Sequence, residues 1–317
     1  MSDLNNYPWI KKAFNNLNIS SLPHSSLIEG NKGLGKAILV DEIAKTILCI
    51  NSNNHPCNQC NSCELYINKT HPDFIKNDDE TKILIDEIRE IIDFSHLSSS
   101  ISSNKVIFLH NCENMNRNSQ NAFLKTLEEP TDNTYILMTS SKKRSLNPTI
   151  YSRCNKIKID NLDQKQINEW VVGQGFNDFN FYDFPSFLNP LEIIQYIEEG
   201  DDKKFINFSE TLFQFCNKQI TINETTKYLI DLDMPLIEKI NLLVDFYKNL
   251  LSSRISKMPY SGKFTKLNDL SFSTINLANV INELNDLREM IYKVSSLNES
   301  HLFKYFIFRL NSIVKLQ

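Results

Sequence analysis

The sequence predicts an α/β P-loop domain followed by a mostly helical second half. The first observation is a short apolar run, Ser26–Glu29, that leads directly into a glycine-rich loop and then into a helical pattern. The second is a pair of runs rich in β-branched and aromatic residues, Lys105–Leu109 and Tyr135–Thr139, which indicate further strands of the same sheet. The third is the near-disappearance of glycine after residue 206, where long amphipathic patterns predict helices.

Composition limits the classes of function. The chain has 317 residues, which suggests two or three domains of about 100–200 residues each. Its net charge of −4 argues against a protein that coats DNA by itself, because that mode of binding needs a strong basic excess. No run of about 18 apolar residues occurs, so no transmembrane helix is expected, and the N-terminus lacks the pattern of a signal peptide. We therefore expect a cytoplasmic protein.

Three of the seven glycines, Gly30, Gly33 and Gly35, lie just before Lys36. Strand, glycine loop and helix form the context of a P-loop, in which backbone amides hold phosphate and the lysine reaches the outer phosphates. The spacing matches the template G-x-x-x-x-G-K-[ST] up to Lys36, but Ala37 replaces the hydroxyl residue that binds Mg²⁺. We expect a P-loop fold that binds Mg-nucleotide poorly, and a tight strand–helix turn without any ligand is the simpler alternative.

The end of the second predicted strand also lacks a catalytic residue type. A nucleotide hydrolase holds Mg²⁺ and positions water with acidic residues at this point. Here Lys105–Leu109 is followed by His110 and Asn111, and the nearest acid, Glu113, comes several residues too late. Together with Ala37, these positions argue against ATP hydrolysis by this chain.

Four of the seven cysteines lie close together, at Cys49, Cys57, Cys60 and Cys63. Zinc prefers a tetrahedron of thiolates on short-loop spacings such as Cys-x-x-Cys, and a closed set of four leaves no open position for a substrate. We therefore predict a structural zinc site, in an intracellular protein with free thiols rather than disulfides. Three alternatives remain: His55 in place of Cys49, an iron–sulfur cluster, and thiols without any metal.

Other elements of the first half follow from periodicity and stop signals. Isoleucines at helical spacing predict a helix over Ile85–Ile92, with charged residues on the opposite face. A second helix is predicted over 116–129, where Pro130 ends it. Ser152–Cys154 is expected on a short helical segment before a last strand, Ile157–Ile159.

The second half carries no sharp chemical motif. Apolar periodicity predicts a small helical lid over 161–205 and a larger helical domain over 206–317. The patterns of Ile237–Leu250 and Ile281–Ile291 are typical of long amphipathic helices. Back in the first half, the basic stretch Lys142–Arg144 is expected to be a solvated loop, with contact to DNA or to a partner as the alternative.

Two strings in the first half resemble the AAA+ subunits of DNA-polymerase clamp loaders. They are Leu124-Lys125-Thr126-Leu127-Glu128-Glu129-Pro130 and Ser152-Arg153-Cys154. The four cysteines after the glycine loop narrow the resemblance to the bacterial branch of that family. Further strings similar to this branch are Tyr7-Pro8-Trp9, Leu22-Pro23-His24, Thr70-His71-Pro72-Asp73 and Ile83-Leu84-Ile85-Asp86-Glu87-Ile88-Arg89. The second half fits the family by its length and helical character.

The resemblance implies a three-part chain. Its parts are an AAA+ P-loop domain over 1–160 that carries the Cys₄ zinc module (49–63), a helical lid over 161–205, and an all-α collar domain over 206–317. It also implies a subunit of the DNA polymerase III holoenzyme, in a ring that opens the sliding clamp and places it on primed DNA. The expected partners in that ring are tau/gamma and delta clamp-loader subunits.

The resemblance gives Arg153 a role as well. In this family the arginine of Ser-Arg-Cys projects into the ATP site of the neighbouring subunit, and a trans arginine finger stabilises charge on the transferring phosphate. The incomplete loop at Gly30–Lys36 and the missing acids indicate the member of the ring that does not hydrolyse ATP. An active ATPase of the tau/gamma type is the first alternative. The second is a zinc-dependent DNA-binding module unrelated to clamp loading.

Overall fold

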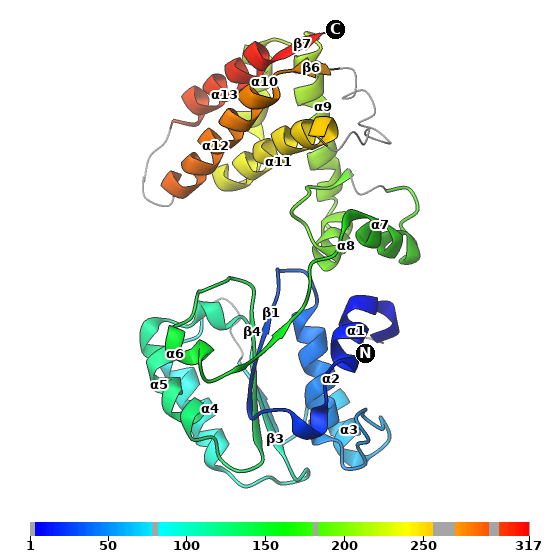
Figure 1. Cartoon of the computed structure of the whole chain (residues 1–317), viewed down its shortest axis with the longest axis vertical. Coiled ribbons are helices and arrows are strands. Elements are labelled where there is room, and N and C mark those ends of the chain that lie inside the picture. The colour runs from blue at the N-terminus through cyan, green and yellow to red at the C-terminus, as the bar shows by residue number, and fades with distance from the viewer. Residues whose placement is uncertain (1–3, 78–81, 180–182, 256–269, 292–297, 317) are drawn as a thin grey trace. The chain divides into compact units, whose positions relative to one another are not determined.

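The chain divides into two compact units, Met1–Leu162 and Asp163–Gln317. The computed structural model, shown in Figure 1, describes residues 4–77, 82–179, 183–255, 270–291 and 298–316. Among the described helices, none combines the length and the apolar character that a membrane crossing requires.

The N-terminal unit is built around a five-stranded sheet in the order β2-β3-β4-β1-β5, in which every neighbouring pair is parallel. The strands are β1 (Ser25–Glu29), β2 (Phe74–Lys76), β3 (Lys105–Leu109), β4 (Thr134–Ser140) and β5 (Asn155–Lys158). Strand β1 lies between β4 and β5, with Leu27 opposite Met138 on one side and Lys156 on the other. Because the strands are parallel, their carboxyl ends meet at one edge, where such sheets bind ligands.

Helices cover both faces of this sheet, with α1 and α2 on one side and α4, α5 and α6 on the other (Figure 1). Side chains alternate along each strand, so Ile28 and Phe108 pack with the first group while Leu27 and Ile107 pack with the second. The helices of the unit are α1 (Pro8–Asn15), α2 (Lys36–Leu48), α3 (Asn61–Ile67), α4 (Ile85–His96), α5 (Arg117–Glu128) and α6 (Pro148–Tyr151). Three short 3₁₀ helices accompany them, η1 (Leu4–Asn6), η2 (Ile19–Ser21) and η3 (Cys112–Asn114).

The predicted α/β fold of the first half is confirmed, and its sheet is parallel. Helix α5 begins after Asn116, whose side chain accepts a hydrogen bond from the Ser119 backbone N–H at 2.9 Å, and it stops before Pro130. Two segments differ from the prediction. Helix α6 ends at Tyr151, so Ser152–Cys154 lies in the turn that follows, and the last strand, predicted over Ile157–Ile159, begins and ends earlier, at Asn155 and Lys158. Strand β2 was not predicted, since three residues are too few to show a period.

The second unit is mainly helical. Its helices are α7 (Gln164–Gly173), α8 (Pro190–Glu198), α9 (Asp201–Cys216), α10 (Ile222–Asp231), α11 (Leu236–Ile255), α12 (Thr274–Ile291) and α13 (Glu299–Ile313). A core rich in aromatic residues joins α9 to α13, and the hydroxyl of the fully buried Tyr247 donates to the Phe306 carbonyl at 2.9 Å. The division into a lid (161–205) and a collar (206–317) stays a prediction.

A small antiparallel sheet of β6 (Leu270–Phe272) and β7 (Val314–Leu316) was not predicted. Its two strands are far apart in the sequence, and each is only three residues long.

Candidate functional site

The glycine loop leads from the carboxyl end of β1 into α2. Gly33 and Gly35 have φ angles of 75° and 79°, in the left-handed region that side chains with a Cβ rarely adopt. Gly30 is needed for a different reason, because a Cβ there would lie 3.3 Å from the Ile159 carbonyl oxygen. The three glycines therefore allow the tight passage from strand to helix that a P-loop requires.

Lys36 is buried, and its ammonium group is bound by the protein's own oxygen atoms. Nζ donates to the carbonyl oxygens of Gly30 at 3.0 Å and Asn31 at 2.9 Å, and to Oγ of Ser141 at 2.7 Å. An ammonium group has three N–H donors, which equals the number of these acceptors. The lysine therefore joins the two ends of the glycine loop to the end of β4.

Trp9 holds the same loop from helix α1. Its indole N–H donates to the carbonyl oxygen of Leu34 at 2.8 Å, and Leu34 itself is fully buried. This contact gives a structural reason for the Tyr7-Pro8-Trp9 string, which sequence reasoning identified only by resemblance.

The end of β3 carries no carboxylate at its first two positions. The His110 backbone N–H donates to Oδ1 of Asn77 at 2.6 Å, and His110 Nδ1 lies 2.9 Å from Oγ1 of Thr139. The backbone N–H of Asn111 also donates to this hydroxyl, at 3.0 Å. These contacts connect the ends of β3 and β4, and none of their side chains is a carboxylate that could hold Mg²⁺.

Glu113 nevertheless reaches the site. Its Oε1 accepts the backbone N–H of Ser141 at 2.9 Å, and the Ser141 hydroxyl accepts from Lys36. A chain of contacts thus runs from Lys36 through Ser141 to Glu113. Sequence reasoning missed Ser141, because only the fold brings the end of β4 next to the glycine loop.

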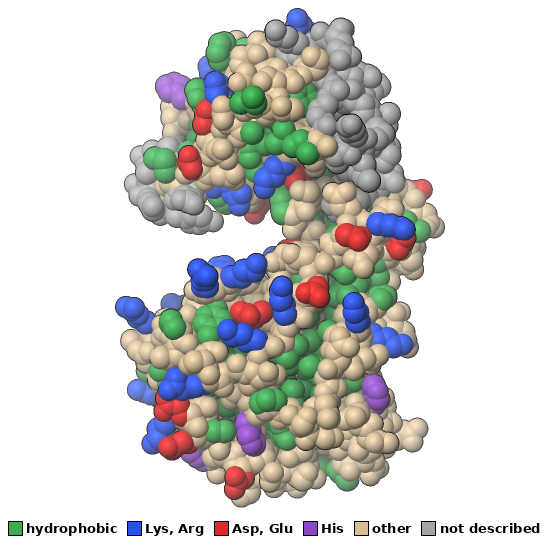
Figure 2. Space-filling view, in the orientation of Figure 1, with side chains coloured by type: hydrophobic (Ala, Val, Ile, Leu, Met, Phe, Trp, Pro, Cys, Tyr) green, Lys and Arg blue, Asp and Glu red, His purple; other side chains and the backbone are tan. Residues whose placement is uncertain are grey.

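A cavity of about 180 Å³ opens beside the glycine loop, at the carboxyl ends of β1, β4 and β5. Three lysines line it, Lys142, Lys143 and Lys158, together with Glu29 and Gly30. Figure 2 shows Lys and Arg side chains gathered at one end of the N-terminal unit. The basic stretch is exposed, as expected of a solvated loop.

Arg153 follows α6 and is held by two elements of its own chain. Nη2 forms an ion pair with the carboxylate of Glu128, the last residue of α5. Nη1 donates to the carbonyl oxygen of Thr149 in α6 at 2.9 Å. Nε is buried and has no hydrogen-bond partner, while the side chain as a whole is 31% exposed. The pairing with Glu128 was not foreseen from the sequence.

The four predicted cysteines come together. All four sulfur atoms lie within 4.8 Å of one another, and the pairs Cys49–Cys60 and Cys57–Cys63 are both 3.9 Å apart. A regular tetrahedron with Zn–S bonds of about 2.3 Å has sulfur–sulfur edges of about 3.8 Å. The separation is far too long for a disulfide of about 2.05 Å. The set therefore fits a tetrahedral metal ion.

Backbone N–H groups point at these sulfurs. The Cys57 and Cys60 amides donate to the sulfurs of Cys49 and Cys57, both at 3.3 Å. Hydrogen bonds from the Gln59 and Cys60 amides lower the pKa of Cys57, which favours the thiolate that a metal needs. Burial raises the pKa of Cys49 and Cys63 in the same cluster, and it also raises the pKa of Cys154 outside it, to about 12.

His71 supports the cysteine loop from outside the cluster. Its Nδ1 accepts the Asp73 backbone N–H at 3.1 Å, so the proton lies on Nε2, which is 2.8 Å from Oγ of Ser62. Ser62 then donates to the Leu48 carbonyl at 2.6 Å. His55, the alternative ligand, packs at a tilt against the ring of Phe14 and is not among the clustered ligand atoms of the described residues.

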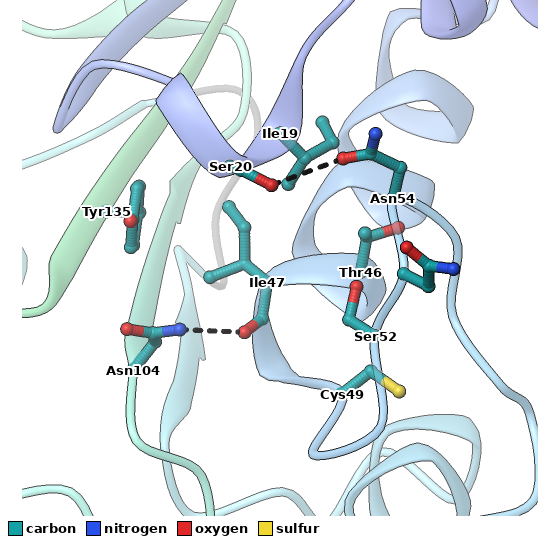
Figure 3. A pocket seen from close by; sticks show the side chains of 10 residues that line it. Ile19, Ser20, Thr46, Ile47, Cys49, Ser52, Asn54, Asn104 and Tyr135 are labelled. Carbon is teal, nitrogen blue, oxygen red and sulfur yellow. Dashed lines mark hydrogen bonds between the residues drawn. The ribbon is translucent and has the colours of Figure 1, made fainter.

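A second cavity, of about 240 Å³, lies beside Cys49 (Figure 3). Its lining is polar but uncharged. The Asn104 side chain donates to the Ile47 carbonyl at 3.0 Å, and Ser20 donates to the side chain of Asn54 at 3.4 Å. It contains none of the acid, base or nucleophile combinations that catalysis requires.

Comparison with known proteins supports the resemblance to DNA polymerase III subunits that the motifs of the N-terminal unit indicated. Residues 8–163 match the family model described as "DNA polymerase III, delta subunit". DNA polymerase III subunit delta' of Haemophilus influenzae is 28% identical over 222 residues, which cover 67% of this chain and 68% of that protein. Subunit delta' of Pseudomonas aeruginosa is 34% identical over 159 residues, 49% of this chain and 48% of that protein.

A gamma subunit is similar as well. DNA polymerase III subunit gamma of Buchnera aphidicola subsp. Schizaphis graminum is 28% identical over 224 residues, 69% of this chain and 60% of that protein. The alignments with these three relatives thus span between 48% and 68% of their length. The resemblance expected from the motifs is confirmed, and the chain resembles the delta-prime subunits of DNA polymerase III.

Proposed function

We propose that this chain is the delta-prime subunit of a clamp loader, and that it does not hydrolyse ATP. In this role it is a rigid member of a ring with tau/gamma and delta subunits, which loads the sliding clamp on primed DNA in the cytoplasm, at the replication machinery of the nucleoid. Residues 161–205 and 206–317 then serve as its lid and collar domains.

The observation that carries the proposal is the state of Lys36. In an active P-loop this lysine reaches the outer phosphates of the nucleotide, but here Gly30, Asn31 and Ser141 supply an acceptor for each of its donors. Ala37 has no hydroxyl for Mg²⁺, and His110 stands where an acidic residue would hold the metal. The glycine loop is therefore kept by this chain as a structural element, and any nucleotide it holds is passive.

The proposed chemical contribution of the chain is Arg153, acting as an arginine finger on the neighbouring subunit. A guanidinium stays charged and presents a planar fork of donors that suits a phosphate. At 31% exposure, part of this side chain is accessible from outside the chain.

We propose zinc as the metal of the Cys₄ site (Cys49, Cys57, Cys60 and Cys63). The tetrahedral spacing of the four sulfurs supports this choice, and a closed set of four thiolates has a structural role. Zinc would hold the loop between α2 and α3 in shape.

The test is ATP hydrolysis by the reassembled ring, in the presence of clamp and primed DNA. Arg153→Ala is expected to lower the stimulated rate while leaving this chain folded, and Arg117→Ala, in an exposed arginine at the start of α5, is the matched control. The isolated chain is expected to show no turnover. ATP hydrolysis by the isolated chain would favour the alternative, an active ATPase of the tau/gamma type. The similarity to a gamma subunit is the observation that supports this alternative.

A further inference from the structure

We infer that Glu128 is the positioning residue for Arg153, holding its guanidinium in the orientation in which it meets a phosphate of the neighbouring subunit. The inference rests on the proposed function and adds to it a second residue. Its basis is the ion pair between Glu128, at the end of α5, and Nη2 of Arg153, which lies in the turn after α6.

Some N–H donors of the Arg153 guanidinium are used within this chain, and others remain for a phosphate of the neighbouring subunit. A guanidinium has five N–H donors. One on Nη1 is used by the Thr149 carbonyl, one on Nη2 by Glu128, and Nε is buried. This leaves one N–H on each terminal nitrogen. An incoming phosphate therefore meets the same two nitrogens that Thr149 and Glu128 hold in place.

Both anchors are needed to fix the plane of this fork. The Thr149 carbonyl alone holds one terminal nitrogen, about which the rest of the long side chain can still turn. Glu128 supplies the second point from a different helix, and two points on a planar group define its orientation. Misplacing a catalytic group by about 1 Å can cost about 10²-fold in rate, so a lost anchor is expected to matter.

The chain offers a matched control in the next residue. Glu129 carries the same charge and is exposed, and among the described residues its side chain makes no hydrogen bond or ion pair. Substituting Glu129 changes the net charge of the chain by the same amount as substituting Glu128. A difference between the two variants then reports on the contact with Arg153 rather than on charge.

The experiment compares rings that contain Glu128→Ala, Glu128→Gln, Glu129→Ala and Arg153→Ala. The quantity measured is the part of the stimulated ATPase rate that Arg153→Ala removes. Glu128→Ala is expected to lower this Arg153-dependent part of kcat roughly tenfold. KM for ATP should stay unchanged, because the finger acts in the transition state. Glu128→Gln keeps an oxygen that accepts from Nη2 and is expected to restore most of the rate. Glu129→Ala should match the unmodified ring.

The double variant separates positioning from a merely structural effect. Glu128→Ala combined with Arg153→Ala is expected to equal Arg153→Ala alone, because Glu128 acts through the arginine. A further loss in the double variant, or an unchanged or raised rate with Glu128→Ala, would overturn the inference. An Arg153→Ala ring with full activity would instead remove the finger itself, and the proposed role with it.

Discussion

Nζ of Lys36 lies 2.7 Å from Oγ of Ser141, although 105 residues separate them along the chain. The contact fastens the glycine loop to the end of β4, and Glu113 holds Ser141 from the other side. The lysine therefore ties two segments of the N-terminal unit together that are distant in the sequence.

Lys36→Ala is expected to destabilise the N-terminal unit. The change leaves the Gly30 and Asn31 carbonyls and the Ser141 hydroxyl without their buried donor, which costs about 1–3 kcal/mol in the free energy of unfolding. Urea unfolding followed by circular dichroism measures it. Lys143→Ala, in an exposed lysine of the same end of the sheet, is the control, and equal stability of the two variants would refute the structural role.

Freshly prepared reduced protein is expected to contain one zinc per chain. Cys60→Ser should lose it, because the site has no spare ligand. Cys216→Ala removes a buried thiol from the second unit and should keep the full metal content. Atomic emission spectroscopy measures the zinc and iron content of each protein. Iron together with labile sulfide, in place of zinc, would show that the iron–sulfur alternative is correct.

His71→Ala is expected to make the cysteine loop less rigid without removing any of the four cysteine ligands of the metal. The variant breaks the path from Asp73 through Ser62 to the end of α2, so zinc should pass to a chelator faster than from the unmodified chain. Colorimetric zinc release measures this rate, with the exposed His301→Ala as control. Ser62→Ala cuts the same path, so combining it with His71→Ala should add little; full additivity of the two effects would argue against a shared path.

Asp245 is expected to make the stability of the second unit depend on pH. Burial raises the pKa of this carboxyl to about 6, although Ser186 donates to it through both backbone and hydroxyl. Because the folded pKa lies above the ordinary value of 3.8, the favourable contribution is complete below pH 3.8 and is lost as pH rises through about 6.

The test compares the unmodified chain with Asp245→Asn. Between pH 4 and pH 7 the free energy of unfolding of the variant should rise relative to the unmodified chain, by about 2 kcal/mol. Thermal unfolding at several pH values measures the difference. A constant difference between the two proteins across this range would contradict the prediction.

Local patterns were enough to predict β1, β3, β4 and the glycine loop. Strand β3 coincides with the predicted Lys105–Leu109, because a fully buried parallel strand is a continuous run of β-branched and aromatic residues. The cluster of four cysteines was equally predictable, since their spacing within a short loop already limits how far apart their sulfur atoms can lie.

Long-range partners were not predictable. Glu128 ends α5, Arg153 lies 25 residues later in the turn after α6, and nothing in their local sequence indicates that they meet. The same holds for Ser141 and Lys36. Such contacts depend on the order of strands in the sheet, which a single sequence leaves open. The arginine finger and the lid and collar domains rest on resemblance and stay proposals.

The position of β1 between β4 and β5 also bears on how the protein is made. Strand β1 pairs with residues of Thr134–Ser140 and Asn155–Lys158, which are synthesised more than one hundred residues after it. Until then its N–H and C=O groups have no neighbouring strand on either side. The N-terminal unit therefore completes its sheet only when nearly all of its chain has been synthesised, and its folding is governed by late, long-range closure.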